Sequence, residues 1–144
     1  MKSTAHTIAA ALYRAHGMLL HDLEKLEAAV EPESGRKIED IRPLLAATQA
    51  HLLRHFRFEE YEGYMDLVRT REPRLERAVQ HLAEEHQQLA NSLSELITEA
   101  DRADALSDTF RAEVQAWLAR VHGHEVRENE LVQDAFSLDL GAKD

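Results

Sequence analysis

Two short motifs and an unusual number of histidines are the features of this sequence most able to support chemistry. Nine histidines occur in 144 residues, and two that fall on apolar stripes precede a glutamate by four positions, giving the pairs His55/Glu59 and His124/Glu128. In a helix, residues i and i+4 point the same way, so each pair can reach one metal ion or a pair of ions. The chain has no cysteine, which excludes disulfides, thiolate metal sites and a cysteine nucleophile.

These residues lie on apolar stripes that predict four long helices. Breaks at 31–35, 70–73 and 100–104 divide the chain, and the segments between them are rich in Leu, Ala, Glu, Arg and Gln. Apolar residues recur at alternating spacings of four and three, as on helices that bury one stripe. The sequence therefore predicts an all-α, antiparallel up-down-up-down four-helix bundle. It is a single domain, 1–144, with helices at about 4–31, 38–70, 73–100 and 105–136 and a tail packed on the bundle end.

Each stripe contains a histidine, and all four histidines are expected near the middle of the bundle. At about 1.5 Å of rise per residue, their heights agree to within about 10 Å, and the two glutamates lie about one turn further along two parallel helices. Burying two unpaired carboxylates would cost several kcal/mol, which two divalent cations would offset. Imidazole and carboxylate together suit iron, manganese or zinc. The residues expected to form this mid-core dinuclear site are His16, His55, Glu59, His86, His124 and Glu128.

The order of these motifs resembles the hemerythrin-like, or HHE cation-binding, family over nearly the whole chain. Four stretches carry the resemblance, one on each predicted helix: Ala15-His16 with Leu26-Glu27, His55 to Glu60, Glu85-His86, and His124 to Leu131. The resemblance implies two iron ions with a bridging oxo or hydroxo group, although zinc or manganese could take their place. It assigns the six residues above as ligands, with Glu59 and Glu128 bridging.

One position departs from the pattern of the family's oxygen carriers. These have a second histidine one turn before the third-helix ligand, where this sequence has Leu82. One metal would then lack an imidazole, or would take a group from elsewhere. The candidates for that group are His81, Glu85, His51 and Glu62. This departure favours sensing, peroxide handling, nitric oxide binding or iron handling over reversible oxygen carriage.

Three classes of function remain open at this point. The first is a di-iron protein that binds or senses O2, NO or peroxide. The second is a di-iron enzyme for peroxide disproportionation or iron oxidation, and the third is a metal-free helical interaction module. A formal net charge of −10 argues against nucleic acid and anionic membranes as partners. No uncharged stretch is longer than that from Ser3 to Tyr13, which is too short for a membrane span, so a cytoplasmic location is expected.

Several other residues carry simpler expectations. Tyr13, one turn before His16, is expected to pack in the core, with a hydrogen bond to a bound oxygen as the alternative. Core positions are also expected for Leu93, Phe110 and Trp117. Four histidines lie off the apolar stripes and are expected in solvent: His6, His21, His81 and His122.

Overall fold

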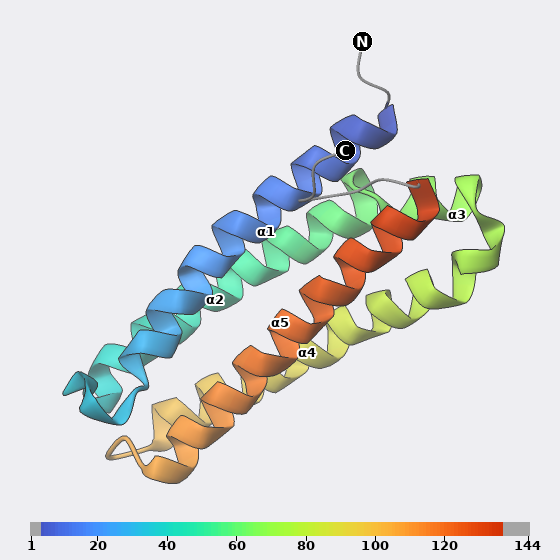
Figure 1. The fold of residues 1–144 in the computed structure, drawn as a ribbon. Helices are drawn as coiled ribbons and strands as arrows, with labels where there is room; N and C mark the ends of the chain where they lie inside the picture. The colour runs from blue at the N-terminus through green and yellow to red at the C-terminus, as the bar shows by residue number, and fades with distance from the viewer. Residues whose placement is uncertain (1–3, 137–144) are drawn as a thin grey trace.

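Four long helices lie side by side in the computed structural model, which describes residues 4–136. They are α1 (Thr4–Ala29), α2 (Ile38–Arg57), α4 (Glu76–Arg102) and α5 (Asp108–Phe136). Figure 1 shows successive long helices running in opposite directions, and α1 and α4 each pack against both α2 and α5. This arrangement confirms the predicted all-α four-helix bundle. The predicted packing of the tail after Phe136 lies outside the described residues.

The prediction of one continuous helix over residues 38–70 is wrong. Here α2 ends at Arg57, a five-residue π-helix η2 (Phe58–Glu62) follows, and after a turn a short helix α3 (Met65–Arg71) begins. The break falls at Gly63, whose φ of −98° and ψ of −137° are not helical. A Cβ at this position would lie 2.9 Å from the Cα of Glu59, so the turn is built around the missing side chain. As a result α3 lies at one end of the bundle (Figure 1).

The remaining breaks fall close to the predicted ones. The short 3-10 helix η1 (Pro32–Ser34) joins α1 to α2 and ends at Gly35, whose φ of 72° suits a residue without a side chain. A second 3-10 helix, η3 (Pro73–Leu75), leads into α4. The last connection is shifted by a few residues from its predicted place, because α4 continues to Arg102 and α5 begins only at Asp108.

The core consists of two apolar clusters with polar side chains between them. The larger one includes Leu93, Phe110 and Trp117, which confirms their predicted core positions. The smaller one lies toward the end of the bundle that carries α3, and it includes Leu12 and Leu82. Tyr13 belongs to neither cluster, since it is 53% exposed, and so the expected core packing of this residue is wrong.

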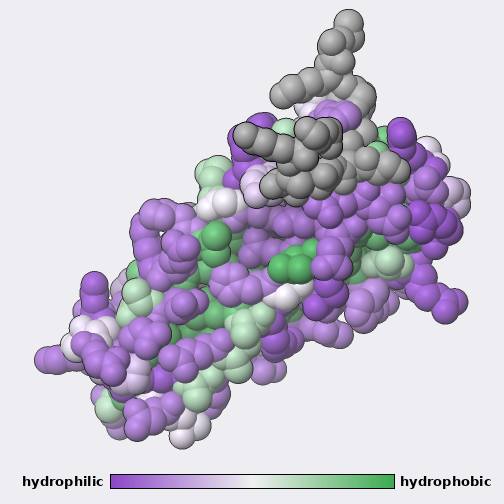
Figure 2. Space-filling model, in the orientation of Figure 1, coloured by the Kyte–Doolittle hydropathy of each residue, from purple (hydrophilic) through white to green (hydrophobic). Residues whose placement is uncertain are grey.

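The face of the bundle drawn in Figure 2 is mostly polar. Hydrophilic side chains dominate the face seen in Figure 2, and hydrophobic ones appear mainly along the seams between helices. Within residues 4–136, no helix has both the length and the apolar character that a membrane span requires.

Candidate metal centre

All six predicted site residues meet between the two apolar clusters. Each is buried, and the side chains of Glu59 and Glu128 have no exposed surface. The possible ligand atoms form two overlapping groups, in each of which every atom lies within 4.8 Å of the others. One group combines His16 and His55 with both glutamates, and the other combines His86 and His124 with the same glutamates. We call these six residues the His/Glu cluster.

The first half of the cluster joins α1 to α2. Nε2 of His16 lies 3.0 Å from Oε2 of Glu59 and 3.1 Å from Oε1 of Glu128. Nε2 of His55 lies 3.1 Å from the same Oε2 of Glu59. Both rings therefore turn their Nε2 atoms toward the shared carboxylates.

The second half joins α4 to α5. Nε2 of His86 lies 3.0 Å from Oε1 of Glu59 and 3.3 Å from Oε2 of Glu128. Nε2 of His124 lies 3.3 Å from Oε1 of Glu128. Each carboxylate thus faces both histidine pairs, which is the placement expected of a group that bridges two ions.

Several buried atoms of this cluster lack a hydrogen bond of acceptable geometry. They are Nε2 of His55, Nε2 of His124 and Oε1 of Glu59. Buried polar atoms are normally satisfied, so unsatisfied atoms that face one another need an explanation. Four imidazoles and two carboxylates form a donor set that suits iron, manganese or zinc. The residues present therefore fit a metal site.

Without metal, the charges of the cluster compensate one another. Burial lowers the pKa of His16, but its hydrogen bonds to Glu128 and Glu59 outweigh burial and raise the pKa to about 10. The same balance raises the pKa of His86 to about 10. Burial raises the pKa of Glu128, but the close contacts of His124, His16 and His86 with its carboxylate outweigh burial and hold this pKa well below its usual range. These shifts favour imidazolium forms of His16 and His86 beside an ionised Glu128.

A further carboxyl group lies next to the cluster. Glu125 on α5 is 8% exposed, and burial raises its pKa to about 7, although the nearby His16 and His55 act in the opposite direction. A carboxyl with a pKa near neutrality can exchange protons at physiological pH.

Three of the four histidines have a polar partner on their outer nitrogen. Nδ1 of His16 lies 3.1 Å from Oδ1 of Asn129. Nδ1 of His86 lies 2.7 Å from Oε2 of Glu60, and Nδ1 of His124 lies 2.8 Å from Oε1 of Glu85. A ring that donates from Nδ1 presents the lone pair of Nε2 to a metal when it is neutral. Sequence reasoning missed these partners.

None of the four candidates for a group in place of a fifth histidine belongs to the two converging donor groups. Leu82 itself is buried in the smaller apolar cluster. His81 and Glu62 are exposed, and the exposed His51 pairs with Asp22 on the surface, while Glu85 bonds to the outer nitrogen of His124 and to Arg127.

A residue that sequence reasoning did not single out reaches the cluster instead. Tyr64 is fully buried, and its hydroxyl donates a hydrogen bond of 2.7 Å to Oε2 of Glu128. Burial, together with the charges of Glu128 and Glu59, raises the pKa of Tyr64 well above its usual value, so the phenol stays protonated. The one signal for this in the sequence was Gly63, which breaks the helix. After the break, Tyr64 no longer has to follow the apolar stripe of α2.

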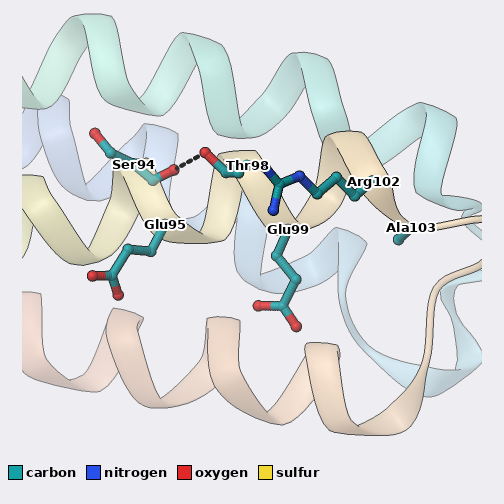
Figure 3. Close-up of a pocket in the computed structure, with 6 residues that line it drawn as sticks. All are labelled: Ser94, Glu95, Thr98, Glu99, Arg102 and Ala103. Atoms are coloured by element: carbon teal, nitrogen blue, oxygen red, sulfur yellow. Dashed lines mark hydrogen bonds between the residues drawn. The ribbon is translucent and has the colours of Figure 1, made fainter.

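Two hollows on the surface differ in whether a residue of the His/Glu cluster lines them. A groove of about 790 Å³ lies between α1 and α2, and its lining includes Gly17, Met18 and His55 of the cluster. Another hollow, of about 580 Å³, lies near the end of α4 that is remote from α3 and contains no cluster residue. Its lining is shown in Figure 3, where Thr98 bonds to Ser94 one turn earlier. Only the first hollow offers a route toward the cluster.

Comparison with known proteins agrees with this geometry. Residues 7–136 match the family described as the hemerythrin HHE cation binding domain. No match was found among curated proteins or among solved structures. The family match covers nearly the whole bundle, including all six residues of the His/Glu cluster, so the chain belongs to the hemerythrin HHE cation-binding domain family.

Proposed function

We propose that the chain binds two iron ions in the His/Glu cluster and uses them to bind or sense O2, NO or peroxide. The observation that carries this proposal is the pair of overlapping donor groups that share Glu59 and Glu128. His16 and His55 would hold one ion, and His86 and His124 the other. Non-haem iron with open positions supplies binding and redox chemistry toward small oxygen and nitrogen species.

The residues of the chain have separate roles in this proposal. The two carboxylates supply negative charge that no other buried group among the described residues could offset once the imidazoles are neutral. Tyr64 holds one oxygen of Glu128 through its hydroxyl, so that this carboxylate keeps one orientation. The groove between α1 and α2 admits small molecules to the side of the cluster that His55 faces.

Metal analysis tests this proposal. Protein produced in iron-supplemented medium should contain about two irons per chain, bound by the imidazole and carboxylate donors, and should show near-ultraviolet charge-transfer absorption. The variant His124→Ala should lose that absorption. His51→Ala is the matched control, because His51 lies on the surface and pairs only with Asp22. Iron content under about half an equivalent, unchanged by His55→Ala, would point to the metal-free interaction module instead.

Turnover separates a binding protein from an enzyme built on the same centre. The loaded protein should shift its optical spectrum on exposure to O2, NO or peroxide after anaerobic reduction, with no sustained consumption. Steady loss of peroxide, or oxidation of more iron than the centre holds, would identify the enzyme.

A further inference from the structure

The two histidine pairs of the cluster differ in what supports their outer nitrogens. Both rings of the second pair bond to carboxylates, Glu60 for His86 and Glu85 for His124. In the first pair, the partner of His16 is the neutral side-chain amide of Asn129. Among the described residues, His55 has no carboxylate partner other than Glu59 of the cluster itself.

This difference follows a regular pattern around the bundle. Each outer partner is the chain neighbour of a cluster residue and comes from the adjacent helix. Glu60, beside α2, supports a ring on α4; Glu85 on α4 supports one on α5; and Asn129 on α5 supports one on α1. The equivalent neighbour on α1 would support His55, but that position is Ala15, which has no polar side chain.

Outer partners control how well an imidazole binds metal. A carboxylate that accepts from Nδ1 fixes the ring and makes Nε2 more basic, and losing such a partner typically lowers metal affinity by about 10- to 100-fold. We propose that the two metal positions are unequal: the His86/His124 position binds its ion tightly, and the His16/His55 position holds an exchangeable ion. This inference rests on the proposed function, because it requires that metal binds in the cluster.

Access to solvent favours the same assignment. The groove of about 790 Å³ includes His55 and Ala15 in its lining, so the weakly supported position lies next to open space. On the other side, a hollow of about 290 Å³ is lined by Glu85 and Arg127 but by no residue of the cluster. Arg127 bonds to Glu85 at 2.5 Å and so holds the carboxylate that supports His124. The exchangeable ion is therefore also the one that an entering molecule meets first.

Stepwise metal binding tests the inequality. The full-length protein, freed of metal, is titrated with Co(II), and binding is followed by calorimetry and by the visible absorption of the ion. We expect two events whose dissociation constants differ by at least about tenfold. His124→Ala should remove the tight event, whereas His16→Ala should remove only the weak one.

Variants of the outer partners distinguish positioning from general damage. Glu85→Gln should weaken the tight event by about 10- to 100-fold and leave the weak event in place. Asn129→Asp should strengthen the weak event, a gain that structural damage cannot produce. Ala15→Glu should do the same by completing the pattern around the bundle. Glu84→Gln is the matched control, because Glu84 is exposed on the same helix and contacts only Gln80.

The outcomes separate the two proposals. Absence of Co(II) binding would overturn the proposed function. Two events of equal affinity would overturn the inequality while leaving a dinuclear centre in place. The inequality would also fall if His16→Ala removed the tight event and His124→Ala left it intact, or if Asn129→Asp did not strengthen the weak event.

Discussion

Metal binding by the His/Glu cluster should release protons. Without metal, His16 and His86 each have a pKa of about 10 because of the carboxylates beside them. Both rings are therefore protonated at pH 7, and an imidazole must be neutral to bind a metal. Removing a proton three pH units below its pKa costs about 4 kcal/mol for each ring. About two protons should leave, one for each ion, and the affinity for each ion should rise by up to about tenfold for each pH unit between 7 and 9.

Calorimetry measures this release directly. Zn(II) is titrated into the metal-free protein at pH 7 in two buffers with different enthalpies of ionisation, and the difference in observed heat gives the number of protons. His16→Gln should lower that number by about one, since it removes one protonated ring. His51→Gln, on the surface, should leave it unchanged. Equal heats in both buffers, or an affinity that does not change between pH 7 and 9, would refute the reasoning.

The same protonation governs the stability of the metal-free protein. A pKa raised from 6.5 to about 10 means that the contribution of His16 and His86 is complete below pH 6.5 and is lost as the pH rises toward 10. The lowered pKa of Glu128 contributes stability above its usual 4.5 that is lost as the pH falls. The melting temperature of the metal-free protein should therefore be highest between about pH 4.5 and pH 6.5. With metal bound, the trend between pH 7 and 9 should reverse, because the rings are then neutral.

Two substitutions near the cluster give further predictions. Gly63→Ala should displace the backbone of Glu59, because the new Cβ would lie 2.9 Å from its Cα. We expect a loss of about 1–3 kcal/mol in the free energy of unfolding and weaker metal binding; Gly17→Ala, where a Cβ meets nothing within 4 Å, should cause neither. Tyr64→Phe should remove the hydrogen bond to Glu128 and lower the free energy of unfolding by about 1–3 kcal/mol. Denaturant titration measures both effects, and an unchanged midpoint in either variant would contradict its prediction.

The apolar stripes account for most of what could be predicted. On the third segment, every position of the apolar stripe is buried: Leu75, Val79, Leu82, His86, Leu89, Leu93, Leu96 and Ala100. A stripe fixes both the direction in which a side chain points and its height along the helix, so polar residues on four stripes at one height must meet. The convergence of the six residues follows from that geometry, whereas the identity of the metal does not.

The helix break after Glu59 was not visible in the periodicity. The spacing His55 to Glu59 suits an ordinary helix, but Glu59 lies in the π-helix η2, which sits next to the cluster as such segments often sit at functional sites. A wider turn leaves no mark in a pattern of apolar residues, and Gly63 was the one local signal. Because the break reorients the chain, Tyr64 points into the core from a position that no stripe would have assigned to it.

The outer partners show how charged residues beside core positions can be misread. Glu60, Glu85 and Asn129 each adjoin a cluster residue, and a polar neighbour of a core position is usually interpreted as part of a solvated face. Neighbours on a helix are about 100° apart, so at a helix interface such a residue faces the next helix rather than water. The neighbour that does so follows the buried residue in η2 and on α5. It precedes the buried residue on α4, because the chain runs in the opposite direction there. By that rule the position for α1 is the one before His16, and the alanine found there leaves His55 as the ring without outer support.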